Sequence, residues 1–182
     1  MHMAQKTKKW TLAEVHRLPD DGNKYELVRG DLFVTPPPSV SHEELAWHLR
    51  RILTPYVESQ GLGRIYSPSS VIQVLESQVE PDLMVRAPLD RGRSWADQPL
   101  PILVVEVASD STRRRDRLQK RELYVDAGVL EYWIVDGETR QMTAIRLGQA
   151  DVITDTSLTW SPAGAREPLV IDVRAYFRAA LG

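Results

Sequence analysis

The sequence of 182 residues contains no cysteine. This absence excludes disulfide bonds, zinc sites with thiolate ligands and cysteine nucleophiles. The chain also lacks any apolar run approaching the ~20 residues that span a bilayer, and its first residues have no apolar core of the kind found in signal peptides. We therefore expect a cytoplasmic protein without membrane spans.

A strong excess of positive charge is missing as well. The chain has 23 Lys and Arg against 25 Asp and Glu, a formal net charge of -2. Proteins that coat nucleic acid are usually basic overall, so the balance argues against that class. The hydrophobic content of 42% is ordinary for a globular protein, and the length fits one domain. We expect a flexible N-terminus over residues 1–9 and a single domain over residues 10–182.

Local patterns predict alternating helices and strands. Thr11 and Ser41 each precede a glutamate by three residues, which is typical of a capping box at a helix start. Gly128 is expected to end one helix and Asp172 to cap the last. The expected helices cover 11–17, 41–58, 111–127 and 173–181, and the expected strands cover 25–28, 32–35, 71–75, 82–85, 102–107, 132–135, 141–147, 152–153 and 169–171. This order predicts an α/β fold with one mixed sheet and helices packed on it.

Two carboxylates stand at unusual places in these strands. Asp82 follows a proline and opens an apolar strand, while Glu106 interrupts a strand that otherwise consists of buried apolar residues. Burying an unpaired charge costs several kcal/mol, so Glu106 is expected to be paired, metal-bound or near solvent. The alternatives are a solvated aspartate at a strand edge and a salt bridge from Glu106 to one of the arginines that follow.

A third group lies on the helix that follows. Asp116, Lys120 and Tyr124 are spaced by four residues and therefore share one helix face. This spacing also suits an ordinary surface ion pair. Carboxylates on two adjacent strands and a lysine on the next helix can instead converge on one point. Such a point suits Mg²⁺, which takes one or two carboxylates and leaves positions for phosphate and water.

Five blocks of the sequence occur in a distinctive order: 25–32 (YELVRGDL), 81–83 (PDL), 104–109 (VVEVAS), 112–120 (TRRRDRLQK) and 124–136 (YVDAGVLEYWIVD). With these blocks, from about residue 10 to residue 176, the chain resembles the PD-(D/E)XK nuclease superfamily and, within it, the restriction-endonuclease-like family of the Uma-two type. The resemblance implies a restriction-endonuclease-like α/β core, with a central mixed β-sheet flanked by α-helices. It also implies hydrolysis of DNA phosphodiester bonds with Mg²⁺ or Mn²⁺, and a homodimer.

The resemblance assigns roles to individual residues. Asp82 and Glu106 would hold the metal, with the carbonyl of Val107 as a third ligand. Glu26 would be a further acidic member, holding a second ion or tuning the site's lysine. The superfamily usually carries that lysine two residues after the second carboxylate, where this chain has Ala108. Lys120, from the following helix, is expected to replace it and to position the attacking water.

The remaining candidates surround this set. Tyr124 is expected to orient a phosphate or the lysine, and His42 is either a site member or an exposed residue beside a helix cap. The densest positive patch begins with Arg113, Arg114 and Arg115. It favours phosphate contact, and the alternative is a solvated helix whose arginines pair with Asp116, Glu122 and Asp126.

Ala108 keeps a second class of function open. The alternative is a catalytically inactive module that kept the nuclease fold and binds nucleic acid or a protein partner. A third reading is a metal-dependent hydrolase that acts on another phosphoester. Metal binding that needs the two carboxylates would favour an enzyme, whereas metal-independent DNA binding would favour the module.

Overall fold

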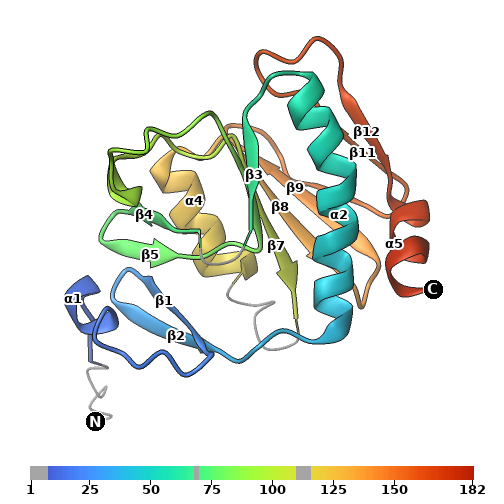
Figure 1. The fold of residues 1–182 in the computed structure, drawn as a ribbon. Helices are drawn as coiled ribbons and strands as arrows, with labels where there is room; N and C mark the ends of the chain where they lie inside the picture. Colours follow the sequence, from blue (N-terminus) through green and yellow to red (C-terminus); the bar gives the residue numbers. More distant parts are fainter. Residues whose placement is uncertain (1–7, 68–69, 110–115) are drawn as a thin grey trace.

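A computed structural model describes residues 8–67, 70–109 and 116–182. Its centre is a six-stranded sheet with the strand order β10–β9–β8–β7–β6–β3 (Figure 1). Strands β7 and β8 run parallel, whereas the other neighbours in this sheet are antiparallel, so the sheet is mixed. Its strands are β3 (Arg64–Tyr66), β6 (Leu83–Arg86), β7 (Leu103–Ala108), β8 (Glu131–Asp136), β9 (Gln141–Arg146) and β10 (Val152–Thr154).

Two smaller sheets and four α-helices complete the described part of the chain. An antiparallel sheet has the order β2–β1–β5–β4, and β11 pairs with β12. The strands are β1 (Lys24–Val28), β2 (Asp31–Thr35), β4 (Ile72–Val74), β5 (Ser77–Val79), β11 (Ser157–Trp160) and β12 (Leu169–Asp172). The helices are α1 (Leu12–Val15), α2 (Val40–Ser59), α4 (Arg121–Ala127) and α5 (Val173–Leu181), with a 3-10 turn at Trp95–Asp97.

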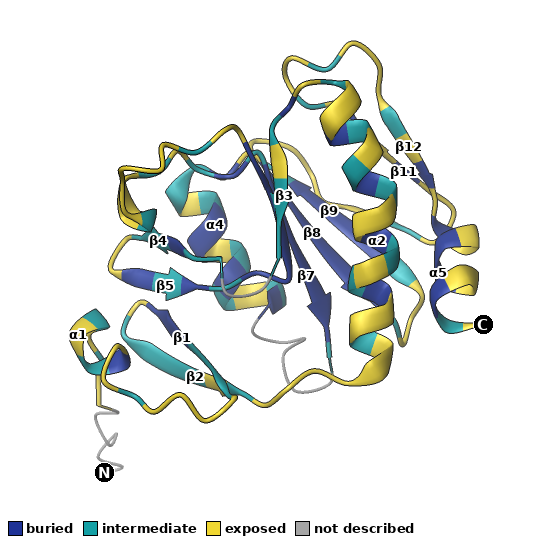
Figure 2. Ribbon diagram, in the orientation of Figure 1, coloured by how far each residue is buried: buried dark blue, intermediate teal, exposed yellow. Residues whose placement is uncertain are grey.

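The central sheet is covered on both faces. Helices α2 and α5 pack on one face, while α4 and the four-stranded sheet β2–β1–β5–β4 lie on the other (Figure 1). Side chains alternate along a strand, so Val105 and Val107 of β7 enter the first core and Val104 and Ala108 enter the second. Strands β7 and β8 are consequently buried along their whole length (Figure 2). This explains the continuous apolar run in the sequence of β7.

The predicted α/β architecture, with a central mixed sheet flanked by helices, is confirmed. The capping box at Thr11 is present, and the side chain of Asp172 caps α5. The expected cap at Ser41 is wrong, because α2 starts earlier and the hydroxyl of Ser39 accepts the backbone N–H of His42. The strands also form three sheets where one was expected, and β3, β5 and β11 were not predicted. These strands have only three or four residues, too few for a periodic pattern.

The helix expected over 111–127 is described only from residue 116 onward. Asp116–Lys120 forms a π-helical turn, and α4 continues from it to a left-handed Gly128 with φ 87°. Single π-helical turns occur frequently at functional sites. Here the turn contains two buried charged residues, Asp116 and Lys120. Among the helices of the described residues, none is long and apolar enough to cross a membrane.

Candidate active site

Strand pairing brings the two carboxylates together. Leu83 of β6 pairs with Val105 of the antiparallel β7, so the preceding Asp82 falls beside Glu106. The backbone N–H of Val107 donates to Asp82 Oδ2 at 2.7 Å. Both carboxylates are nearly inaccessible, with 4% and 2% of each residue exposed. Two neighbouring interior strands of the sheet thus present two acidic groups side by side.

Side-chain alternation decides what Glu106 contacts. Glu106 points to the same face of β7 as Val104 and Ala108, toward the π-helical turn and α4. There its Oε1 accepts hydrogen bonds from Lys120 Nζ at 2.7 Å and from the hydroxyl of Tyr124 at 3.0 Å. Lysine and tyrosine four residues apart thus meet one carboxylate, as their shared helix face predicted.

Lys120 is the centre of a buried ionic cluster. Its Nζ lies 2.8 Å from Glu26 Oε1, 2.7 Å from Glu106 Oε1 and 3.9 Å from Asp116 Oδ1. The lysine and Glu26 have no solvent exposure at all. Glu26 Oε1 also accepts the backbone N–H of Glu80 at 2.9 Å. Strand β1 is therefore tied to the π-helical turn through charges that face the protein interior.

Two basic residues flank Asp82 on its other sides. His42, in the first turn of α2, places Nε2 3.1 Å from Asp82 Oδ2. Lys24, the first residue of β1, places Nζ 3.5 Å from Asp82 Oδ1 and donates to the carbonyl of Glu80 at 3.0 Å. His42 is therefore a site member, and the alternative of an exposed residue beside a cap is wrong. Lys24 was not predicted as a site residue.

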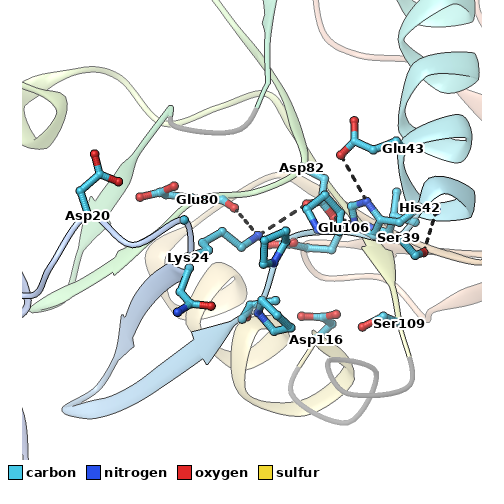
Figure 3. Close-up of a pocket in the computed structure, with 17 residues that line it drawn as sticks. Asp20, Lys24, Ser39, His42, Glu43, Glu80, Asp82, Glu106, Ser109 and Asp116 are labelled. Carbon is cyan, nitrogen blue, oxygen red and sulfur yellow. Dashed lines mark hydrogen bonds and ion pairs between the residues drawn. The ribbon is translucent and has the colours of Figure 1, made fainter.

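A pocket of about 690 Å³ opens in front of the carboxylates (Figure 3). Its described lining comes from the loop before β1 and the start of β1, the end of β2 with the proline-rich loop and first turn of α2 that follow it, the segment before β6, the end of β7 and the π-helical turn. The lining residues are Asp20, Gly22, Asn23, Lys24, Thr35, Pro36, Pro37, Pro38, Ser39, His42, Glu43, Glu80, Asp82, Glu106, Val107, Ser109 and Asp116. Lys120, Glu26 and Tyr124 lie outside this lining.

The two carboxylates respond differently to burial. Burial alone would raise the pKa of Asp82, but the hydrogen bond with His42 and the charge of Lys24 outweigh it and hold that pKa well below its usual range. Burial raises the pKa of Glu106 to about 7, and the charge of Lys120 opposes this rise only in part. Burial and the charge of Glu106 also raise the pKa of Tyr124, which keeps its hydroxyl protonated as a donor.

The donor set at the pocket fits a hard divalent cation. The described residues contain no ready-made group of three or more His, Asp or Glu ligands. Mg²⁺ needs only one or two carboxylates, because it keeps several waters. Within the described chain, Glu106 Oε2 has no hydrogen-bond partner, and Asp82 Oδ1 has only the ion pair with Lys24 at 3.5 Å. Each carboxylate therefore retains an oxygen that could coordinate an ion.

The remaining predicted site residues are Tyr124 and the arginines of the basic run. Tyr124 is fully buried and hydrogen-bonded to Glu106, so its position favours orienting that carboxylate over contacting a phosphate. Arg113, Arg114 and Arg115 lie outside the described residues. Of the later arginines, Arg117 pairs with Asp136 at 3.2 Å and Arg121 with Asp151 at 2.9 Å. Of the expected acidic partners of this basic run, Asp116 pairs with Lys120 at 3.9 Å.

Comparison with known proteins identifies the family. No match is found among curated proteins. A solved structure from Anabaena variabilis ATCC 29413, described as "a putative nuclease belonging to DUF820", is 19% identical and covers 94% of this chain and 99% of its own, with a TM-score of 0.79. At this identity the likeness shows the fold. A family model described as "Uma2: Putative restriction endonuclease" matches residues 12–173. The chain therefore belongs to the Uma2 family, as the five sequence blocks predicted.

Proposed function

We propose that this protein is a divalent-metal-dependent endonuclease that hydrolyses phosphodiester bonds in DNA. The observation that carries the proposal is the placement of Asp82 and Glu106 side by side at an open pocket. Membership of a family described as putative restriction endonucleases supports the reaction class. Proteins of this kind generally use divalent metal ions, which supports the metal dependence.

Asp82 and Glu106 would hold the ion, Mg²⁺ or Mn²⁺, and the carbonyl of Val107 would add a third protein ligand. A bound ion of this kind lowers the pKa of coordinated water and offsets charge on the phosphate. The residues behind the carboxylates keep them in place. His42 and the backbone N–H of Val107 orient Asp82, while two donors on Oε1 leave Oε2 of Glu106 available at the pocket.

Lys120 acts through Glu106 in this proposal. Its ammonium is enclosed by carboxylates and has no exposure to the pocket, so it does not touch a water held there. Its charge offsets the cost of burying Glu26 and Glu106, which would otherwise tend to take up protons. Glu26 in turn fixes the position of the lysine, which is the tuning role expected from the sequence. Tyr124 adds a second donor to Glu106.

The proposed substrate is DNA, and the acidic surroundings of the pocket give the ion a further role. Phosphates approaching so many carboxylates are repelled unless cations intervene. Arg113, Arg114 and Arg115 are proposed as phosphate contacts because they adjoin the pocket residues Ser109 and Asp116 in sequence. A homodimer would supply two such pockets for the two strands of a duplex.

Nicking of supercoiled plasmid with Mg²⁺ or Mn²⁺ tests the proposal. The wild type is compared with Asp82→Asn, Glu106→Gln and the control Asp155→Asn, which changes an exposed aspartate paired with Arg174. We expect the wild type and the control to nick, both pocket variants to be inactive, and EDTA to stop the reaction. Equal nicking by all four proteins would refute the assigned site. DNA binding that needs no metal, without nicking in any protein, would favour the inactive module.

A further inference from the structure

The described lining of the pocket carries far more negative than positive charge. Six carboxylates contribute to its described lining: Asp20, Glu43, Glu80, Asp82, Glu106 and Asp116. Among the described lining residues, Lys24 is the one side chain that is permanently positive, and His42 is positive only when protonated. Within the described lining, Lys24 is therefore the permanent cation that a substrate phosphate can meet.

Lys120 is not available for this contact. Its Nζ is already engaged by Glu26 at 2.8 Å and Glu106 at 2.7 Å, and it has no exposed surface. Drawing it toward the pocket would leave two buried carboxylates without a counter-charge, which is strongly unfavourable. The lysine expected to take part in catalysis is thus committed to the protein interior.

Lys24 has the opposite environment. Its side chain is 20% exposed and reaches along the pocket to lie between Glu80 and Asp82 (Figure 3). One contact is a hydrogen bond to the carbonyl of Glu80, and the other is a long ion pair of 3.5 Å to Asp82 Oδ1. Lysine is a compact charge on a flexible stem, so its ammonium can turn toward a phosphate without moving β1.

We propose that Lys24 is a substrate-contacting cation of this site and donates a hydrogen bond to a non-bridging oxygen of the scissile phosphate. The inference rests on the proposed function and extends it to a residue outside the superfamily's motif. Lys24 transfers no proton in this role. Negative charge on the phosphate oxygens grows as water attacks and the leaving oxygen departs, so an ammonium already positioned there stabilises the transition state.

The test combines DNA affinity with cleavage for Lys24→Met, Lys24→Arg and the control Lys9→Met. Lys9 is an exposed lysine whose Nζ lies 2.7 Å from Asp31, outside the pocket. Binding of a short labelled duplex is measured over a range of salt concentrations with Ca²⁺ in place of Mg²⁺. Loss of one phosphate contact lowers the magnitude of the negative slope of log K against log salt by about 0.9. We expect this change for Lys24→Met and for neither Lys24→Arg nor Lys9→Met.

Cleavage and folding complete the test. With Mg²⁺ or Mn²⁺, Lys24→Met should reduce kcat by about 10² to 10³-fold, and Lys24→Arg should restore part of it. A normal slope and normal cleavage in Lys24→Met would overturn the inference while leaving the nuclease intact. A normal slope with lost cleavage and a lowered melting temperature would show a structural role and also overturn it. If the wild type neither binds nor cleaves DNA, the proposed function fails, and the inference fails with it.

Discussion

Replacing Lys120 by methionine tests whether the buried ionic cluster depends on its single lysine. Methionine has a similar length and remains apolar, so the core stays filled while the charge disappears. Glu26 and Glu106 then remain buried without the charge of the lysine, since the side chain of Glu26 has no exposure and that of Glu106 is 3% exposed. Removing one partner of a buried ion pair typically costs about 3–5 kcal/mol. We expect Lys120→Met to lower the free energy of unfolding near neutral pH by that amount.

Lys9→Met is the matched control for this change. The Lys9–Asp31 pair has the same nitrogen-to-oxygen distance as the Lys120–Glu106 pair, 2.7 Å. Its side chains are 62% and 41% exposed, and exposed pairs contribute about 0–1 kcal/mol. The two variants therefore remove ion pairs of equal length that differ in how deeply they are buried. Urea unfolding followed by tryptophan fluorescence measures both, because Trp133 and Trp160 are fully buried in the native state.

A double variant separates the charge effect from a packing effect. Adding Glu106→Gln to Lys120→Met removes one of the uncompensated charges and keeps an acceptor for the hydroxyl of Tyr124. We expect the double variant to recover about 0.5–3 kcal/mol relative to the single variant, since contacting residues couple by this amount. Equal losses in Lys120→Met and Lys9→Met, or no recovery in the double variant, would refute the electrostatic reasoning.

Two further predictions concern His42 beside Asp82 and the glycines between α2 and β3. His42→Ala removes the side chain that hydrogen-bonds Asp82, so the affinity for Mn²⁺, measured by calorimetry, should fall about 10 to 100-fold. The control His48→Ala changes a histidine on the same helix but outside the pocket and should leave that affinity unchanged. An equal loss in both variants would contradict the role assigned to His42. Gly63 has φ +122°, and an added Cβ would lie 2.0 Å from a backbone carbonyl of β6, whereas Gly61 has φ +68° and open space around it. Gly61→Ala should lower the free energy of unfolding by about 1–2 kcal/mol because alanine is strained in a left-handed backbone. Gly63→Ala should lower it by at least about 1 kcal/mol more, because its Cβ also clashes with the backbone of β6. Similar urea midpoints for the two variants would be evidence against this reasoning.

The sequence by itself determined the family, the order of the main elements and the two adjacent carboxylates, Asp82 and Glu106, of the candidate site. These features depend on local patterns. An apolar run interrupted by Glu106 marks a buried strand with a charge to satisfy, and spacing of four aligns Lys120 with Tyr124 on a helix. The ordered blocks around these residues sufficed for the resemblance that the family model confirms.

The tertiary structure alone decided which charged groups face the pocket. Lys120 is excluded from solvent because β1 packs against the π-helical turn, a contact between residues far apart in sequence. The same packing places Lys24 at the pocket, although nothing in its local sequence distinguishes it from other lysines. His42 joins Asp82 only because α2 starts one residue after Ser39 and points its first turn at β6. Local periodicity specifies which face of an element is apolar, whereas the partner of a buried charge is set by how the elements pack together.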